Sequence, residues 1–165
     1  GAGKDTLLAG VLRARPDLRL VRRVITRPEA AGGEAFEGVT DTEFTQRRDR
    51  GDFALHWAAH GLRYGIPHSQ IVGVGDVVFN GSRAALPQAF QAFPDLRVIV
   101  ITAPDDILAA RLEARGREAA ADITARLARA PFALPPGIAA TQILNDATPV
   151  IGTARLLAAL YPERA

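Results

Sequence analysis

The stretch GAGKDTLL, residues 1–8, decides the fold, because a glycine turn with a lysine leads directly into an apolar helical pattern. A Gly-x-Gly-Lys run at a helix start is the second half of a phosphate-binding loop, in which backbone N–H groups and the positive helix terminus surround the phosphate. The sequence therefore predicts such a loop at residues 1–6, with a plain helix start after a glycine turn as the alternative. The helix itself is indicated by apolar positions 7, 8, 11 and 12.

The first half of that loop is missing from the chain. A complete loop has another glycine several residues earlier, and the sequence contains no methionine, not even at its first position. We therefore expect that the natural protein extends upstream. On this expectation, the strand that precedes the loop and the loop's first glycine are absent from these 165 residues.

Lys4 is the only lysine in the chain, although lysine and arginine together number 20. Every other basic residue in this chain is arginine, which supplies positive charge equally well. A lysine at position 4 therefore indicates a site that requires a compact ammonium group with three donors. Lys4 would reach the transferred phosphate. Asp5 stands where Ser or Thr commonly contacts magnesium, and the hydroxyl follows one residue later at Thr6. Thr6 is accordingly the candidate near Mg²⁺, partly through water.

Composition narrows the class of protein. With 48% hydrophobic and 23% charged residues, the chain is expected to form one globular domain over residues 1–165. The net charge of +2 does not favour a nucleic-acid partner, and no run approaches the roughly 18 apolar residues of a membrane span. The absence of cysteine excludes a disulfide framework and Cys-based metal sites. Because there is also no secretory leader pattern, we expect a cytoplasmic protein with neither nucleic-acid nor membrane partners. Composition does not indicate the oligomeric state.

Apolar runs and helical patterns alternate along the chain, which predicts an α/β fold with a parallel sheet. The run RVIVIT, residues 97–102, is rich in β-branched residues and typical of a buried parallel strand. Thr40 has Glu43 at the capping-box spacing and predicts a helix that ends at Gly51. Further strands are predicted at 21–26 and 76–80, and further helices at 104–115, 122–130 and 149–160, the last with apolar positions 150, 151, 156, 157 and 160.

Two pairs of arginines indicate a phosphate-binding lid. Arg111 and Arg115 are four residues apart, and Arg126 and Arg129 are three apart, so each pair shares a helix face on either side of Gly116. A mobile flap over about 111–130 can bring these guanidinium groups to a polyphosphate, and phosphoryl transfer gains most of its acceleration from positioned charge. Solvated helix faces are the alternative explanation.

Nine short motifs extend the pattern over essentially the whole chain: GAGKDTLL, RRVITRP, GE, EF, GDFALHWAAHGLRYGIP, VVFNGSRA, RLEARG, ITARL and ILND. Their order resembles the guanylate kinase superfamily of phosphate-loop kinases, and more closely the ribose 1,5-bisphosphate phosphokinase family within it. The resemblance implies a P-loop NTPase fold, with a parallel sheet flanked by helices and a helical lid. It also implies ATP and Mg²⁺ as cofactors, and phosphorylation of ribose 1,5-bisphosphate to 5-phosphoribosyl 1-diphosphate, with ADP, in phosphonate catabolism.

The same resemblance implies roles for the site residues. Lys4, Arg115 and Arg126 would act in catalysis, and Asn145 would lie near the adenine. An acceptor-binding region would span about residues 27–70, where Arg27 and Tyr64 hold the acceptor phosphate. The ATP-binding set is Gly1, Ala2, Gly3, Lys4, Asp5, Thr6, Arg111, Arg115 and Asn145. The acceptor, a small phosphorylated sugar, would be bound by Arg27, Glu34, His60, Tyr64, Asn80, Ser82 and Arg83.

Departures from the guanylate kinase pattern favour a sugar over a base. Guanylate kinases read guanine with a Glu after their G-x-F segment and with a Ser or Thr directly after YG. In this chain the first position holds Leu55 or His56, and the second holds Ile66. Phe36 likewise stands in place of a tyrosine. Arg83 stands where those kinases have acidic residues, which favours a more anionic acceptor. A nucleoside monophosphate kinase and a non-catalytic guanylate-kinase-like binding module stay open as alternatives.

Overall fold

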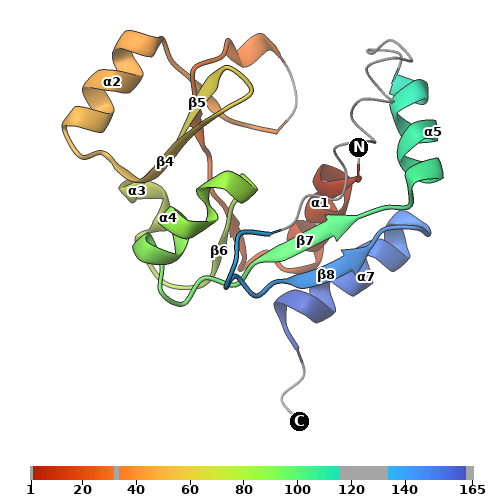
Figure 1. Cartoon of the computed structure of the whole chain (residues 1–165). Helices are drawn as coiled ribbons and strands as arrows, with labels where there is room; N and C mark the ends of the chain where they lie inside the picture. The colour runs from red at the N-terminus through yellow and green to blue at the C-terminus, as the bar shows by residue number, and fades with distance from the viewer. Residues whose placement is uncertain (1, 32–33, 116–133, 163–165) are drawn as a thin grey trace. The chain divides into compact units, whose positions relative to one another are not determined.

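The computed structural model describes residues 2–31, 34–115 and 134–162. The chain divides into two compact units, which we call the terminal unit (residues 1–15 and 97–165) and the central unit (residues 16–96). Each unit has its own strands and helices (Figure 1). A single domain over residues 1–165 stays a prediction.

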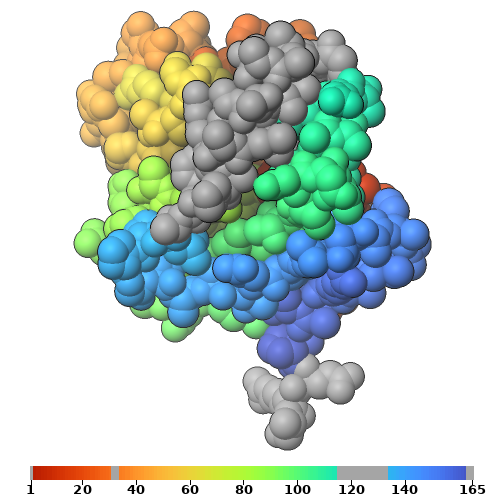
Figure 2. Space-filling model, turned by 45° about the vertical axis from the view of Figure 1, so that its right-hand side comes forward, coloured from red at the N-terminus to blue at the C-terminus, as the bar shows by residue number. Residues whose placement is uncertain are grey.

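The terminal unit is a pair of parallel strands with helices beside it. β7 (Ile99–Thr102) pairs in parallel with β8 (Thr141–Leu144). α1 (Lys4–Ala14) packs against α7 (Pro149–Leu160), and α7 also contacts β8. α5 (Asp105–Arg115) follows β7, and Figure 2 shows α5 and the segment from β8 to α7 on one face of the surface. The parallel strand and the three helices predicted for these residues are confirmed, although β7 is half-buried rather than fully buried.

Two glycines let α1 and α7 approach closely. A Cβ on Gly10 would collide with the Thr153 side chain, and a Cβ on Gly152 would lie 2.6 Å from Cδ2 of Leu7. This approach corrects the apolar face predicted for α7, where Val150 and Ile151 are 78% and 44% exposed. Gly152 faces α1 in the first turn, so the two larger side chains are turned toward solvent.

The central unit contains a four-stranded sheet and a separate parallel pair of strands. The sheet has the order β3 (Glu37–Gly38), β2 (Val24–Ile25), β5 (Leu62–Pro67), β4 (Phe53–Ala59), with β2 and β3 parallel and the other pairs antiparallel. The parallel pair is β1 (Arg19–Leu20) with β6 (Val77–Val78). The helical elements are α2 (Asp41–Asp49), α3 (His68–Ile71), α4 (Leu86–Ala92) and the 3-10 turns η1 (Glu29–Ala31) and η2 (Arg83–Ala85).

The strand predicted at 21–26 is confirmed in shorter form as β2, which begins at Val24 and pairs with β3 and β5. The strand just before this range, β1, belongs to the other sheet and pairs with β6. Between β1 and β2, the backbone N–H of Arg22 donates to Oε1 of Gln70 at 3.0 Å, so a side chain takes the place of a neighbouring strand. The strand predicted at 76–80 is confirmed in shorter form as β6.

β4 and β5 form an antiparallel hairpin that the alternation of strands and helices did not predict. His60 and Gly61 connect the two strands with φ values of 53° and 73°, as a two-residue type I′ turn requires. Trp57 of β4 lies opposite Tyr64 of β5, and their rings stack with centroids 5.4 Å apart. The fold is therefore α/β, with an antiparallel hairpin in addition to its parallel strands.

Apolar side chains of the hairpin contribute half of the main core cluster of the central unit. Phe53 extends this packing to α2, because its ring centroid lies 4.7 Å from that of Phe44. The capping box predicted for α2 is confirmed: Oγ1 of Thr40 accepts from the Glu43 N–H, and the Glu43 carboxylate accepts from the Thr40 N–H. The main core cluster consists of Val21, Leu55, Trp57, Ile66, Ala85 and Ala89.

One predicted element lies outside the described residues, namely the helix at 122–130, and with it most of the predicted lid. Within the parts of the chain that the structure describes, no helix is long and apolar enough to cross a membrane.

Candidate active site

The predicted phosphate loop leads into α1 with the geometry that an anion site needs. Gly3 is the N-cap of α1 and has a left-handed backbone with φ of 83°, which a residue without a Cβ adopts at little cost. The first hydrogen bond inside the helix runs from the Leu7 N–H to the Gly3 carbonyl at 3.2 Å. The amides of residues 4–6 therefore have no acceptor within the helix, and a phosphate can take their hydrogen bonds. Gly1 lies outside the described residues.

Lys4 and Thr6 are both exposed on the first turn of α1. The Lys4 ammonium lies 2.7 Å from Oδ1 of Asp5, and the two side chains are 49% and 64% exposed. A surface ion pair of this kind contributes about 0–1 kcal/mol. A bound phosphate can displace Asp5 from Lys4, so this pair does not prevent the predicted role of the lysine.

Asn145 and Arg111 meet at the carbonyl group of Ala2. Nδ2 of Asn145 donates to this oxygen at 2.7 Å, and Nη1 of Arg111 donates to it at 3.4 Å. Asn145 follows β8 and is buried, and its own backbone N–H donates to the Thr102 carbonyl at 2.7 Å. The structure thus brings two predicted ATP-binding residues to the phosphate loop from α5 and from the end of β8.

Two predicted catalytic arginines are not placed by the structure. Arg115 is the last residue of α5, and its side chain is not described. Arg126 lies outside the described residues. Their roles, and the role of Asn145 beside the adenine, stay predictions.

In the central unit, three side chains form a largely buried polar group that we call the Arg23–Glu34–Asn80 cluster. Nε of Arg23 donates to Oε1 of Glu34 at 2.6 Å, and Nδ2 of Asn80 donates to Oε2 of the same carboxylate. Nη1 of Arg23 also donates to the Asn80 carbonyl at 3.1 Å. The Arg23 and Glu34 side chains are 14% and 11% exposed. Both oxygens of Glu34 thus have protein donors.

The cluster connects to Tyr64, a predicted acceptor-binding residue. Cζ of Arg23 lies 5.1 Å from the centroid of the Tyr64 ring, whose other neighbour is Trp57. Ser82 and Arg83 follow Asn80 along the chain, where Ser82 precedes η2 and Arg83 begins it. The structure therefore joins Glu34, Asn80 and Tyr64 through Arg23.

The remaining predicted acceptor residues are placed differently. The Arg27 guanidinium lies over the Phe36 ring, with Cζ 4.4 Å from the centroid. His60 is exposed at the tip of the hairpin. Its place in the turn, with φ of 53°, gives it a structural role that needs no ligand. Leu55 and Ile66, which stand at the base-reading positions of guanylate kinases, are buried in the core.

His56 lies on β4 with its side chain partly covered. Burial, and then the positive charges of Arg48 and Arg63, hold the pKa of its imidazole below the ordinary value. The neutral form of His56 is therefore favoured in the folded protein.

Arg23 is the residue of this region that sequence reasoning missed. It stands in the quoted motif RRVITRP, where only Arg27 was assigned a role. The available signal was a charged residue inside the apolar run predicted as a strand at 21–26, and this signal does not single out one of 19 arginines. Its partners lie 11 and 57 positions away, so local patterns could not identify them.

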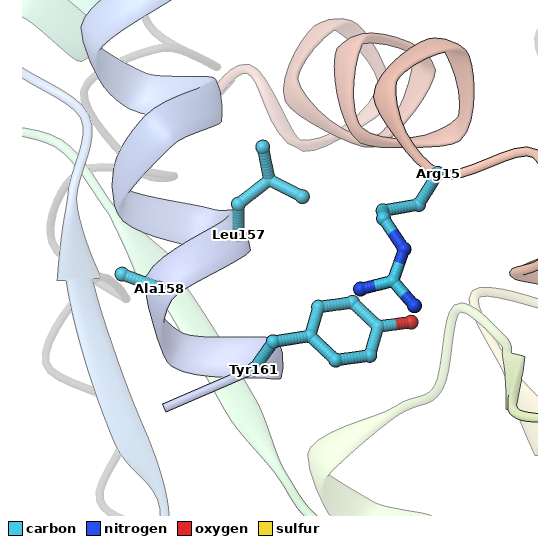
Figure 3. Close-up of a pocket in the computed structure, with 4 residues that line it drawn as sticks. All are labelled: Arg15, Leu157, Ala158 and Tyr161. Atoms are coloured by element: carbon cyan, nitrogen blue, oxygen red, sulfur yellow. The ribbon is translucent and has the colours of Figure 1, made fainter. Parts of the chain in front are cut away.

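A pocket of about 350 Å³ lies at the other end of α1. It is lined by Arg15, Leu157, Ala158 and Tyr161, and Figure 3 shows the Arg15 guanidinium over the Tyr161 ring, with Cζ 3.8 Å from the centroid. Because α1 rises about 1.5 Å per residue over its 11 residues, this pocket is separate from the phosphate loop.

Comparison with known proteins identifies the family. The chain is 52% identical over 141 residues to ribose 1,5-bisphosphate phosphokinase PhnN of Ruegeria sp. (strain TM1040), covering 84% of this chain and 74% of the relative. It is 48% identical over 152 residues to the protein of the same name from Agrobacterium fabrum, covering 88% and 83%. The chain belongs to the ribose 1,5-bisphosphate phosphokinase family. The family predicted from the nine motifs is confirmed.

Two further comparisons extend this result. A bifunctional ribose 1,5-bisphosphokinase-thymidine phosphorylase of Cupriavidus necator is 43% identical over 164 residues, which are 97% of this chain and 27% of that protein. The crystal structure of guanylate kinase from Anaplasma phagocytophilum matches with a TM-score of 0.63 at 18% identity, covering 96% of this chain and 80% of that one. The phosphate-loop kinase fold is thereby confirmed. No family model matches the chain.

Proposed function

We propose that the protein transfers the γ-phosphoryl group of ATP to ribose 1,5-bisphosphate, giving 5-phosphoribosyl 1-diphosphate and ADP. As a member of a phosphokinase family it is a kinase, that is, a phosphotransferase. The observation that carries the proposal is Lys4, the only lysine of the chain, placed at the first position of α1 directly after left-handed Gly3. A function in phosphonate catabolism and a cytoplasmic location are part of the same proposal.

The terminal unit supplies donors that suit ATP. Lys4 offers a mobile ammonium group, the start of α1 offers backbone amides, and Arg111 offers a guanidinium at the loop. Within the described ranges, no group of three His, Cys, Asp or Glu side chains could hold a metal on its own. The donors present fit Mg²⁺ that is bound mainly by phosphate oxygens and water, with Thr6 as a protein ligand. Bound in this way, the ion would neutralise charge on the phosphates.

The central unit supplies the groups proposed for the acceptor. Arg27 and Arg83 are cations that suit its phosphates, and Tyr64 and Ser82 carry hydroxyl groups that can bond to a phosphate or a sugar. Leu55 and Ile66 are buried and apolar, so they offer no hydrogen bond to a base. This difference favours a phosphorylated sugar over a nucleoside monophosphate.

The proposed chemistry requires no general base. An oxygen of the acceptor's 1-phosphate, already ionised at neutral pH, attacks the γ-phosphorus in line. A new P–O bond forms, the bond from the γ-phosphorus to the β,γ-bridging oxygen breaks, and ADP leaves with that electron pair. Lys4, the lid arginines and the α1 amides would stabilise the charge on the transferred group, which is the main task of a protein in phosphoryl transfer.

A direct assay tests the proposal. The intact protein is incubated with ATP, Mg²⁺ and ribose 1,5-bisphosphate, GMP or AMP in parallel, and ADP release is measured alongside ³¹P NMR of the product. Formation of a diphosphate at the sugar C1 supports the proposal. Equal use of GMP would instead indicate a nucleoside monophosphate kinase, and binding without turnover would indicate a non-catalytic module.

A further inference from the structure

The Asn145 side chain occupies a slot between two glycines. A Cβ on Gly3 would lie 2.5 Å from Nδ2 of Asn145, and a Cβ on Gly152 would lie 2.8 Å from Oδ1. The side chain of Asn145 is buried, and the residue is anchored at the end of β8 by its backbone bond to Thr102. Its carboxamide is therefore fixed in orientation, with the NH₂ group directed at the Ala2 carbonyl.

The Ala2 carbonyl controls the direction of the next amide. A trans peptide unit is planar, so the C=O of Ala2 and the N–H of Gly3 point in opposite directions. When Asn145 holds the carbonyl on its side, the Gly3 N–H is directed away from Asn145. Loop amides directed to a common point are what a phosphate-binding loop requires.

We propose that Asn145 is a positioning residue that aims the Gly3 N–H at the nucleotide phosphates. This inference rests on the proposed function, because it assumes that the loop binds ATP. It assigns to the buried carboxamide a role different from contact with adenine. The 2.7 Å bond from Asn145 holds the Ala2 carbonyl, and the proposed role requires that this bond persists when nucleotide binds.

Arg111 shares the same carbonyl by a longer bond of 3.4 Å. A bond of this length is weaker than that of Asn145, so Arg111 can exchange the carbonyl for a phosphate oxygen when nucleotide binds. The loop keeps its conformation during this exchange because Asn145 retains the carbonyl. Arg111 thus moves from the Ala2 carbonyl to the phosphate, whereas Asn145 stays bonded to the carbonyl.

Two substitutions of similar size test the proposal in the intact protein. Asn145→Leu removes the donor, and Asn145→Asp replaces it with an acceptor beside the Ala2 carbonyl. We expect each to raise the Kd for ADP and the KM for ATP about tenfold or more, as for the loss of a hydrogen bond to a buried group. The KM for the sugar acceptor should change less than about threefold. Asp146→Asn, at the neighbouring exposed position, is the matched control and should leave both constants unchanged.

The NMR signal of the Gly3 amide distinguishes orientation of the Gly3 N–H from a purely structural role of Asn145. In the wild-type protein, the Gly3 amide resonance should move on addition of ADP in a ¹H–¹⁵N spectrum. It should move little in Asn145→Leu, whereas Arg111→Ala should weaken ADP binding but keep the Gly3 response at saturation. If the leucine variant does not fold, Asn145→Asp carries the test.

The outcomes distinguish the two proposals. Wild-type affinity for ADP in both folded Asn145 variants overturns the positioning role and leaves the kinase function intact. An equal rise in both KM values, or a wild-type Gly3 response in the variants, also overturns it. A wild-type protein that neither binds ADP nor turns over ATP overturns the proposed function, and the positioning role with it.

Discussion

Replacement of Arg23 by methionine should destabilise the central unit more than any surface substitution on the same segment. The change removes three polar contacts, namely two guanidinium contacts with Oε1 of Glu34 and the bond to the Asn80 carbonyl, together with the contact with the Tyr64 ring. It also leaves the Glu34 carboxylate buried with Asn80 as its remaining donor. Methionine keeps much of the side-chain volume, so the loss is mainly electrostatic.

The magnitude follows from the burial of the pair. Removing one partner of a buried ion pair costs about 3–5 kcal/mol, and a charge-assisted hydrogen bond contributes about 1.5–3 kcal/mol. Because Arg23 and Glu34 are 14% and 11% exposed, some water reaches them, and we expect a loss near or just below the lower end of the range for a buried ion pair. The free energy of unfolding should fall by about 2–4 kcal/mol, a large share of the roughly 5–15 kcal/mol typical of a domain.

A double-mutant cycle measures this effect. Trp57 is the only tryptophan and lies in β4, so its fluorescence in urea reports unfolding of the central unit. The variants are Arg23→Met, Glu34→Gln and the double substitution. The double substitution leaves no unpaired charge, so its loss in the free energy of unfolding should be smaller by about 1–3 kcal/mol than the sum of the two single losses. The control is Arg22→Met. The Arg22 guanidinium pairs with Glu29 at 3.3 Å on the surface, so this substitution should lower the free energy of unfolding by less than about 1 kcal/mol. Additivity within about 0.5 kcal/mol, or an equal loss in the control, would refute the reasoning.

Three further predictions concern the loop, the acceptor and the pH dependence. Lys4→Ala should lower kcat at least about a hundredfold in steady-state kinetics, because it removes charge stabilisation at the transferred group, and should change the free energy of unfolding by less than about 0.5 kcal/mol. Turnover near wild type would contradict the proposed loop. GMP should be a poor acceptor in parallel kinetics, because the positions that read the base in guanylate kinases hold Leu55 and Ile66, which are buried in the core. Polar groups of a base that lose their partners in this way cost about 1–3 kcal/mol each. Burial holds the pKa of His56 below its ordinary value, so protonation favours the unfolded chain. The free energy of unfolding should therefore fall as the pH drops below about 6.5, and urea unfolding of His56→Gln should lack this decrease; an unchanged pH profile would contradict it.

Features that depend on neighbouring residues could be predicted from the sequence. The phosphate loop, the capping box of α2 and the start and end of α5 each follow from the spacing of a few adjacent positions. The hairpin was missed because its strands follow directly on a helix and lack a two-residue turn of the most typical composition. His60 with Gly61 adopts the same positive φ values that Asn-Gly would, so the geometry is ordinary although the sequence signal is weak.

Hydrogen bonds between distant residues could not be predicted in this way. Asn80 and Glu34 are 46 positions apart, and Asn145 and Ala2 are 143 apart. The motifs indicated that Glu34, Asn80 and Asn145 matter, and assigned them to ligands. In the structure, each of these three side chains is hydrogen-bonded to another part of the protein. These partners are distant in the sequence and come together only in the folded chain.

This distinction separates two kinds of residue within the predicted sites. Lys4 and Thr6 are exposed, and Lys4 has only a weak surface partner, so these side chains can turn to a ligand at little cost. Asn145 is buried and Glu34 is only 11% exposed, and both are hydrogen-bonded to protein groups. A ligand could therefore bind them only by breaking a bond whose loss leaves a polar group unpaired. Substitutions of the exposed kind should therefore change kinetics at constant stability, whereas substitutions of the buried kind should change both. A variant of Glu34 that lost acceptor binding but kept the wild-type free energy of unfolding would show that its carboxylate leaves Arg23 for the sugar.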